Sequence, residues 1–452
     1  MDSTDSPISN SVAGWISNLR SSTVARDGLY VLTAQGLATA IALVADSLLF
    51  RELSLLERGT LTTALAIQAV LLIIADLGLS LTTVRIGSEY HAKGLYDEAH
   101  AVFRSALFIR LSLALLLTIL SFFLAPTLTH FPLAAVGRTH LVWAPAMAVV
   151  GTTLVAWGVD VAQSRRKFGI YFALQVTAAL LRTVAIAAVI YVASKQLSDH
   201  RVEQPSSEIV LWAICGASLL AGLISVLLQK SVLIPSLNSL PSNSSALNQQ
   251  LRRFSRYAAA SVLLNGIGGY VEVFMIQGFF DSSQTAVFEG GRRLAMILPL
   301  LTTAITTVLL PRAAALNSTA ACAEYLKKAI KISLPLALLS AIGLAAMASI
   351  LVPLLWGNKY EASVPVLHWL CLAHAFAIAL NPLTLVLYPL RREGTIILLN
   401  ALSFVLSIVL GLWLIPRYGP MGAAWSLCGL KGIMTVLFGA VLVLSIRKGR
   451  TS

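Results

Sequence analysis

Ionisable and amide side chains interrupt the long apolar stretches of this sequence, and their chemistry needs explaining first. The basic residues in these stretches are Arg110, Arg182, Arg292, Arg293 and Lys431. The other polar candidates are Asp46, Asn265, Glu272 and Glu289. A charge at the centre of a bilayer costs about 2.5–3.5 kcal/mol or more, so such groups normally face a protein interior or a water-filled cavity. Because an arginine fork fits phosphate oxygens, the basic set predicts binding of an anionic head group, with the acidic and amide set lining the cavity or taking part in gating.

Several of these residues also have a purely structural interpretation. Glu289 and Arg293 are four residues apart on one helix and can neutralise each other. Asp46 lies near a predicted helix end and can be hydrated there. Lys431 can extend its ammonium towards the membrane surface. Arg182 can pair with an acid on another helix, so internal charge neutralisation is the alternative to an anion site.

Sequence signals for other chemistry are missing. No Walker A sequence, H-E-x-x-H motif or plausible nucleophile elbow is present. The four cysteines have no C-x-x-C spacing, so neither a zinc site nor a disulfide framework is indicated: Cys215, Cys322, Cys371 and Cys428. We therefore expect no enzyme activity, no metal and no cofactor.

The elements that hold these residues follow from composition. Hydrophobic residues make up 57% of the 452 residues and charged residues 12%, with a mean hydropathy of +0.81. Soluble proteins average about 25% charged residues. Apolar runs of about 20 residues, long enough to cross a hydrocarbon core, recur along the chain. The sequence therefore predicts an all-α, multi-pass integral membrane protein.

The apolar runs predict about twelve membrane-spanning helices in two groups of six. The first six are 28–50, 59–84, 101–124, 140–163, 168–193 and 208–230. The second six are 254–279, 285–311, 327–354, 363–389, 394–415 and 420–446. The expected organisation is a tail (1–27), an N-terminal lobe (28–230), a Ser- and Asn-rich linker (231–253), a C-terminal lobe (254–446) and a short tail (447–452). The first tail is either a helix lying on the membrane or disordered.

The two halves contain related features. Three polar residues recur with one spacing: Gln35, Thr39 and Asp46 in the first half, and Ser261, Asn265 and Glu272 in the second. A shift of 226 residues relates these sets, and it also relates Arg165-Arg166 to Arg391-Arg392. A common shift favours an internal repeat. With six helices each, the lobes would be related by a pseudo-two-fold axis along the membrane normal and would face a shared cavity.

Basic residues predict the orientation. Loops and tails on one side carry about 21 Lys and Arg residues, and those on the other side carry 7. Both termini are therefore expected in the cytoplasm. The same distribution explains the net charge of +13 without nucleic acid as a partner.

Three stretches of the sequence resemble a known family. Residues 71–94, 269–301 and 387–427, the last with "LIPRYGPMGAA" (414–424), resemble the Wzx-type polysaccharide-biosynthesis flippases. These belong to the multidrug/oligosaccharidyl-lipid/polysaccharide exporter superfamily. The chain departs from the family at Glu272, where Asp is more frequent, and at "AVF" (286–288), where a Gly-x-Tyr is more frequent.

The resemblance implies a monomeric transporter of the bacterial inner membrane, for which a coupling ion such as H⁺ or Na⁺ is an option. It would flip an undecaprenyl-pyrophosphate-linked oligosaccharide to the periplasmic leaflet by alternating access, in contact with membrane lipid and other polysaccharide-assembly proteins. The main alternative is a cation-coupled multidrug antiporter of the same superfamily. A membrane polymerase or ligase, which would need a larger periplasmic loop, and a non-transporting scaffold are further alternatives.

Overall fold

The computed structural model describes residues 23–130, 132–133, 135, 137–198, 206–233, 259–303, 319–387 and 393–448. Within these ranges the chain forms helices and no strands. Ten of the helices are long and apolar enough to cross a membrane. The predicted class, an all-α multi-pass membrane protein, is therefore confirmed. The interfacial helix predicted before residue 23, most of the linker and the last four residues lie outside the described residues.

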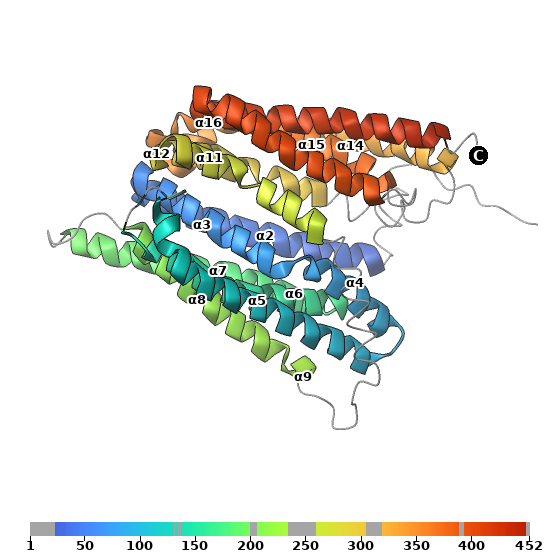
Figure 1. Ribbon diagram of the computed structural model, residues 1–452, viewed down its shortest axis with the longest axis horizontal. Coiled ribbons are helices and arrows are strands. Elements are labelled where there is room, and N and C mark those ends of the chain that lie inside the picture. Colours follow the sequence, from blue (N-terminus) through green and yellow to red (C-terminus); the bar gives the residue numbers. More distant parts are fainter. Residues whose placement is uncertain are drawn as a thin grey trace, which may run out of the picture.

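The helices form two lobes (Figure 1). The N-terminal lobe contains α2 (Thr23–Glu52), α3 (Leu55–Asp76), α4 (Leu79–Ala92), α5 (Tyr96–His130), α6 (His140–Ser164), α7 (Phe168–Ser198), α8 (Ser207–Leu228) and α9 (Lys230–Leu233). The C-terminal lobe contains helical residues 259–268, α11 (Val271–Phe279), α12 (Ser282–Ala295), helical residues 298–303, α14 (Thr319–Trp356), the 3₁₀ turn η1 (Asn358–Tyr360), α15 (Ser363–Leu387) and α16 (Glu393–Lys448).

Several predicted spans differ from the observed helices. The span predicted at 59–84 is divided between α3 and α4, because Leu77 and Gly78 adopt φ values of 44° and 70°. The span predicted at 285–311 begins as α12 and is described only as far as residue 303. The last two spans form α16, whose helical geometry is interrupted at Gly419 (φ 56°, ψ −132°) between Pro416 and Pro420.

The two lobes repeat one helix arrangement. His130 at the end of α5 and Trp356 at the end of α14 are separated by the same 226 residues that relate the polar sets. In the first lobe α6 packs against α3 and α5, and in the second α15 packs against α12 and α14. Similarly, α2 packs along α7, and α11 packs along α16. The contacts therefore follow the repeat found in the sequence.

The lobes approach each other where α2 ends and α3 begins, and they diverge towards the end that carries α4 and α9 (Figure 1). We call the contact region, formed by residues 47–63 with 277–282 and 354–360, the inter-lobe seal. Lys359 Nζ donates to the Leu53 carbonyl at 2.6 Å, and Ser47 Oγ donates to the Leu355 carbonyl at 2.7 Å. The ring of Phe50 lies 4.3 Å from that of Trp356. Polar and aromatic contacts thus join the lobes at this end.

Close backbone approach completes the seal. A Cβ atom at Gly59 would lie 1.6 Å from the carbonyl oxygen of Ser282, so only glycine allows α3 and α12 to meet there. Beside this contact, Thr60 Oγ1 donates to Ser282 Oγ at 3.1 Å, and Thr63 Oγ1 donates to Gln277 Oε1 at 3.2 Å. These contacts hold α12, with its acid and two arginines, against α3.

Candidate functional site

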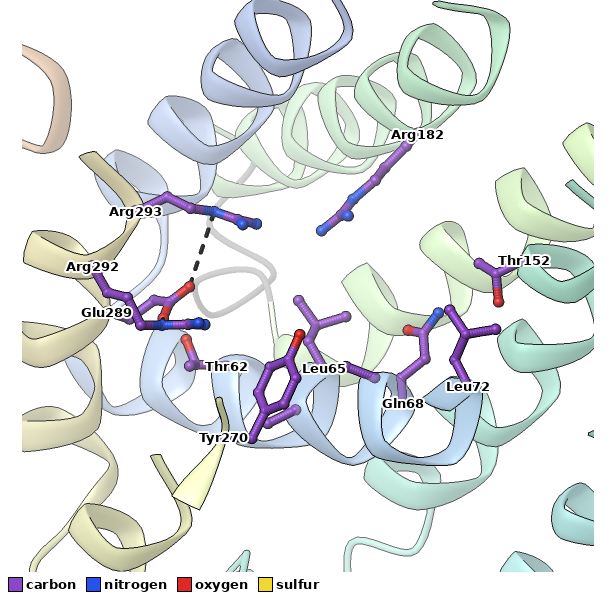
Figure 2. Close-up of a pocket in the computed structure, with 12 residues that line it drawn as sticks. Thr62, Leu65, Gln68, Leu72, Thr152, Arg182, Tyr270, Glu289, Arg292 and Arg293 are labelled. Atoms are coloured by element: carbon purple, nitrogen blue, oxygen red, sulfur yellow. Dashed lines mark hydrogen bonds and ion pairs between the residues drawn. The ribbon is translucent and has the colours of Figure 1, made fainter. Parts of the chain in front are cut away.

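A cavity of about 260 Å³ lies between the lobes, beside the seal (Figure 2). The N-terminal lobe contributes Thr62, Leu65, Ala66, Gln68, Ala69 and Leu72 from α3, Thr152 from α6 and Arg182 from α7. The C-terminal lobe contributes Tyr270, Glu289, Arg292 and Arg293. Because both lobes line the cavity, any movement of one lobe against the other changes its shape.

The packing of α12 directs three charged side chains into this cavity. Asp281 caps the start of the helix, and its carboxylate accepts the backbone N–H of Gln284 at 2.9 Å. Gly290 and Gly291 face α15, where a Cβ atom would approach Ser363 Oγ to 2.7 Å and Val366 Cγ1 to 3.0 Å. Because this face is packed so closely, Glu289, Arg292 and Arg293 remain on the cavity side.

Each arginine of α12 has a carboxylate partner. Arg292 Nε lies 2.6 Å from Glu289 Oε2. Arg293 Nε lies 2.6 Å from Asp46 Oδ2, and its Nη2 donates to Asp46 Oδ1 at 3.3 Å. Glu289 lies 4.0 Å from Arg293 and does not neutralise it alone. Since Asp46 belongs to α2, the Asp46–Arg293 ion pair joins the two lobes.

Arg182 differs from these two arginines because its guanidinium makes no hydrogen bond or ion pair with the described residues. It extends from α7 across the cavity towards Arg293 (Figure 2). Its electrostatic neighbours are Asp46, Arg58 and Arg293, so two of the three are also cations. An arginine that faces cations and has no acid of its own favours the arrival of an anion.

The charges of the region do not balance. They are the guanidinium groups of Arg58, Arg182, Arg292 and Arg293 and the carboxylates of Asp46 and Glu289. Four cations against two anions leave two positive charges in excess. In a site partly shielded from water these charges attract anions strongly and repel cations.

Arg110 lies elsewhere, in a network inside the N-terminal lobe. Its Nη1 donates to Asp160 at 2.8 Å, and its Nη2 contacts Asp76. Ser80 Oγ donates to Asp160 at 2.7–2.8 Å, and the Ser80 backbone N–H donates to Asp76 at 3.2 Å. The network joins α3, α4, α5 and α6 beside the helix interruption at Leu77.

Glu272, Asn265 and Lys431 are placed within the C-terminal lobe. Glu272 is buried and accepts a hydrogen bond from Ser407 Oγ of α16 at 3.1 Å. Lys431 lies close enough to interact electrostatically with Glu272, and its ammonium makes no hydrogen bond or ion pair with a described residue. Asn265 is exposed, and its side chain donates to the Ser261 carbonyl at 3.0 Å. The structure therefore brings Arg182, Glu289, Arg292 and Arg293 together and places Asp46 beside them. Glu272 lies outside the cavity lining but within electrostatic range of Arg292 and Lys431, whereas Arg110 and Asn265 lie apart.

Three residues of this region, Arg58, Gln68 and Tyr270, are not among the sequence candidates. The predicted span begins at residue 59 and so leaves Arg58 in a loop. The stretch Ser54-Leu-Leu-Glu57 is a capping-box signal for an earlier start, and Ser54 indeed accepts the Glu57 N–H at 3.2 Å. Gln68 is a polar residue within an apolar helix, which is a usable signal. Tyr270 carries no comparable signal, because its place beside Arg292, 5.6 Å from ring centre to guanidinium, depends on the fold.

Solved structures with the same fold define the class. An inward-closed lipid II flippase MurJ superposes with a TM-score of 0.68, at 15% identity, over 93% of this chain and 87% of its own. An inward-facing multidrug-resistance MATE transporter of the MOP superfamily gives 0.71, at 14% identity, over 93% and 96%. A MOP-superfamily transporter from Pyrococcus furiosus, described as having a binding pocket of reverse polarity, gives 0.62, at 14% identity, over 93% and 96%. The chain therefore has the fold of MOP-superfamily transporters.

The sequence comparison identifies the family within this class. The sequence model of the family described as "Polysaccharide biosynthesis protein" matches residues 24–317, more than half of the chain. The chain belongs to this family. No curated protein sequence matches it.

Proposed function

We propose that the protein moves an undecaprenyl-pyrophosphate-linked oligosaccharide from the cytoplasmic to the periplasmic leaflet by alternating access. The observation that carries this proposal is the cavity between the lobes with two positive charges in excess. A pyrophosphate that links a lipid to a sugar carries about two negative charges at neutral pH, because each phosphate retains one strongly acidic group. The head group would therefore balance the charge of the site, while its lipid chain stays in the bilayer.

The distribution of basic residues supports an orientation. Described lysines and arginines are fewer at the seal end, where Arg51, Arg58 and Lys359 lie, than at the opposite end. Those at the opposite end include Arg85, Lys93, Arg165, Arg166, Lys167, Lys230, Lys327, Lys328 and Lys331. Positive residues favour the cytoplasmic side, so the seal would face the periplasm and both termini the cytoplasm. In a bacterial inner membrane the described conformation would be inward-facing, with the cavity closed on the periplasmic side.

The antiporter alternative predicts a cationic drug in the same cavity. Such a ligand would have to enter against the unpaired Arg182 and the excess of arginine over acid. Cation binding is unfavourable in that environment. We therefore expect no efflux of a cationic dye such as ethidium from cells that produce the protein, and efflux above the background of empty cells would favour the antiporter.

Reconstituted transport tests the proposal. Proteoliposomes containing a fluorescent polyprenyl-pyrophosphate disaccharide would be quenched from outside, so that the protected fraction reports movement between leaflets. We expect the wild type to move this lipid and the Arg182→Met, Arg292→Met double variant to lose most of the rate. Arg138→Met is a matched control, because Arg138 lies outside the cavity and pairs with Glu57 and Glu208 of its own lobe. An unchanged rate in the double variant would refute this use of the cavity.

A further inference from the structure

Arg58 presents an unusual combination of burial and missing partners. Its side chain is only 1% exposed. Nη1 donates to Thr62 at 3.1 Å, but Nε and Nη2 have no hydrogen-bond acceptor among the described residues. Buried polar groups are nearly always hydrogen-bonded, so donors left over in one state need an explanation.

The nearest acceptor for these donors is Asp46, which belongs to the same lobe. Arg58 Nη2 lies 3.5 Å from Asp46 Oδ1, within ion-pair range but longer than a charged hydrogen bond. Arg293 of the other lobe contacts both oxygens of Asp46: its Nη2 donates to Oδ1 at 3.3 Å, and its Nε lies 2.6 Å from Oδ2 in an ion pair that lacks hydrogen-bond geometry. Two arginines, one from each lobe, therefore share one carboxylate, and the partner from the opposite lobe makes the shorter contacts.

The lobes cannot separate at the seal while Arg293 remains on Asp46. Arg58 and Asp46, in contrast, would move as a unit when the lobes separate, because α2 and α3 belong to one lobe. Phe50, whose ring centre lies 4.1 Å from the Arg58 guanidinium, also belongs to this lobe and supports the arginine from one side. A small rotation of the Asp46 side chain would exchange one guanidinium for the other.

We propose that Asp46 passes from Arg293 to Arg58 when the seal opens, which makes Arg58 a positioning residue for the conformational change. Building on the proposed function, the lipid pyrophosphate is the competitor that releases Arg293, since Arg293 lines the cavity and Arg58 does not. The exchange replaces Arg293–Asp46 with Arg293–phosphate and Arg58–Asp46. After the exchange Arg58, Arg293 and Asp46 each have an opposite charge, and anion binding thereby weakens the contact between the lobes.

The distance across the seal tests this exchange. Leu56 of α3 and Leu354 of α14 are exposed residues at the seal end of opposite lobes. They would be changed to cysteine for spin labels in the full chain, with the four native cysteines replaced, and distances would be measured in nanodiscs without added lipid. We expect Arg58→Met to increase the short-distance population, because Asp46 then has Arg293 as its only partner. Arg58→Lys, which retains the charge, should restore part of the long-distance population.

The matched variant Asp46→Asn removes the shared carboxylate. It should increase the long-distance population, and adding Arg58→Met to it should have no further effect. A role of Arg58 in folding alone would lower thermal stability in both backgrounds and leave the distances unchanged. The proposal is overturned if Arg58→Met leaves the distances unchanged. It is also overturned if Arg58→Met changes the distances equally in the wild-type and the Asp46→Asn backgrounds. If Arg58→Met does not fold, Arg293→Met with Arg58 intact must lengthen the distance, and failure to do so overturns the proposal.

Transport and binding separate this proposal from the proposed function. For Arg58→Met we expect the transport rate of the polyprenyl-pyrophosphate disaccharide to fall by about fivefold or more, in the range of typical allosteric coupling. Affinity for the same lipid in the inward-facing state should stay near that of the wild type. If the wild type moves no lipid but the distances respond as described, the exchange stands and the proposed function fails. If transport is normal and the distances do not respond, the proposed function stands and the exchange fails.

Discussion

Arg110 and Arg182 are both arginines within apolar helices of the N-terminal lobe, yet their surroundings differ completely. Arg110 contacts two carboxylates, Asp76 and Asp160, and its side chain is 1% exposed. Arg182 projects into the cavity and makes no ion pair with a described acid. The comparison shows that an intramembrane arginine is defined by its partners: one that is neutralised by carboxylates stabilises the fold, whereas one without an acidic partner is available to a ligand.

The largest effect is expected from Arg110→Met. The substitution leaves two carboxylates in the lobe interior without their cation, and breaking a buried pair in this way typically costs about 3–5 kcal/mol. Thermal unfolding followed with a thiol-reactive dye measures this, because Cys215, Cys371 and Cys428 are buried until the protein unfolds. Adding Asp160→Asn should recover part of the loss. An unchanged unfolding temperature for Arg110→Met would break the comparison.

Arg182→Met is expected to affect binding rather than stability. No described acid loses its partner, so the unfolding temperature should stay the same or rise slightly. Charged hydrogen bonds contribute about 1.5–3 kcal/mol, so affinity for a polyprenyl-pyrophosphate lipid should fall by about 10- to 100-fold. Binding to the protein in nanodiscs provides the measurement. A large drop in stability with unchanged affinity would place Arg182 in the same class as Arg110.

Arg182→Lys sharpens the comparison, because it keeps the charge and removes the planar fork. An ammonium acts as a point charge and cannot make the bidentate contact that a guanidinium makes with phosphate. Losing one hydrogen bond costs about 1 kcal/mol, so we expect affinity to fall about fivefold. The same binding measurement applies. An affinity as low as that of Arg182→Met would mean that fork geometry matters and charge alone does not.

Arg138→Met should have the smallest effect. Arg138 pairs with Glu57 at 3.0 Å and Glu208 at 2.6 Å, and all three side chains are 21–31% exposed. These carboxylates raise the pKa of the guanidinium, which remains charged at any relevant pH. Partly exposed ion pairs contribute about 0–1 kcal/mol and are weakened by salt. The unfolding temperature should therefore fall slightly at low salt and match the wild type at high salt, whereas a large, salt-independent loss would contradict this assignment.

Hydropathy is sufficient to predict the helical membrane class and most spans, because these properties depend on residues close together in the sequence. The two-lobed repeat follows from polar residues that recur after 226 residues. The partners of charged side chains are harder to predict from the sequence. Asp46 and Arg293 are 247 residues apart, and they meet only because Gly59 allows α3 to contact α12. Asp46 and Glu272 occupy equivalent repeat positions, yet one contacts the opposite lobe and the other contacts Ser407 of its own. Tertiary packing decides such differences, and a single sequence does not record it.

Local conformation explains the remaining differences between the predicted and the observed helices. The apolar pattern continues through residues 77–78 and predicts a single helix, whereas positive φ values at Leu77 and Gly78 divide it. In "PRYGPMG" the glycine and prolines do indicate a break, and Gly419 provides it. The cluster of glycine and proline in that stretch thus makes its break visible in the sequence. At residues 77–78 the sequence offers Gly78 alone, and the contacts of Asp76 that stabilise this break are tertiary.

The chemistry of the seal has a consequence for how this surface can evolve. Ser47, Arg51 and Lys359 all donate across the lobes to backbone carbonyl oxygens, including those of Leu53 and Leu355. Every residue type supplies that oxygen, so the acceptor positions can change identity without losing the hydrogen bond. Correlated substitutions between the lobes should therefore be sparse along these contacts and concentrated at pairs of side chains such as Asp46 and Arg293. Homologues can thus diverge widely at the acceptor positions and still close the same seal.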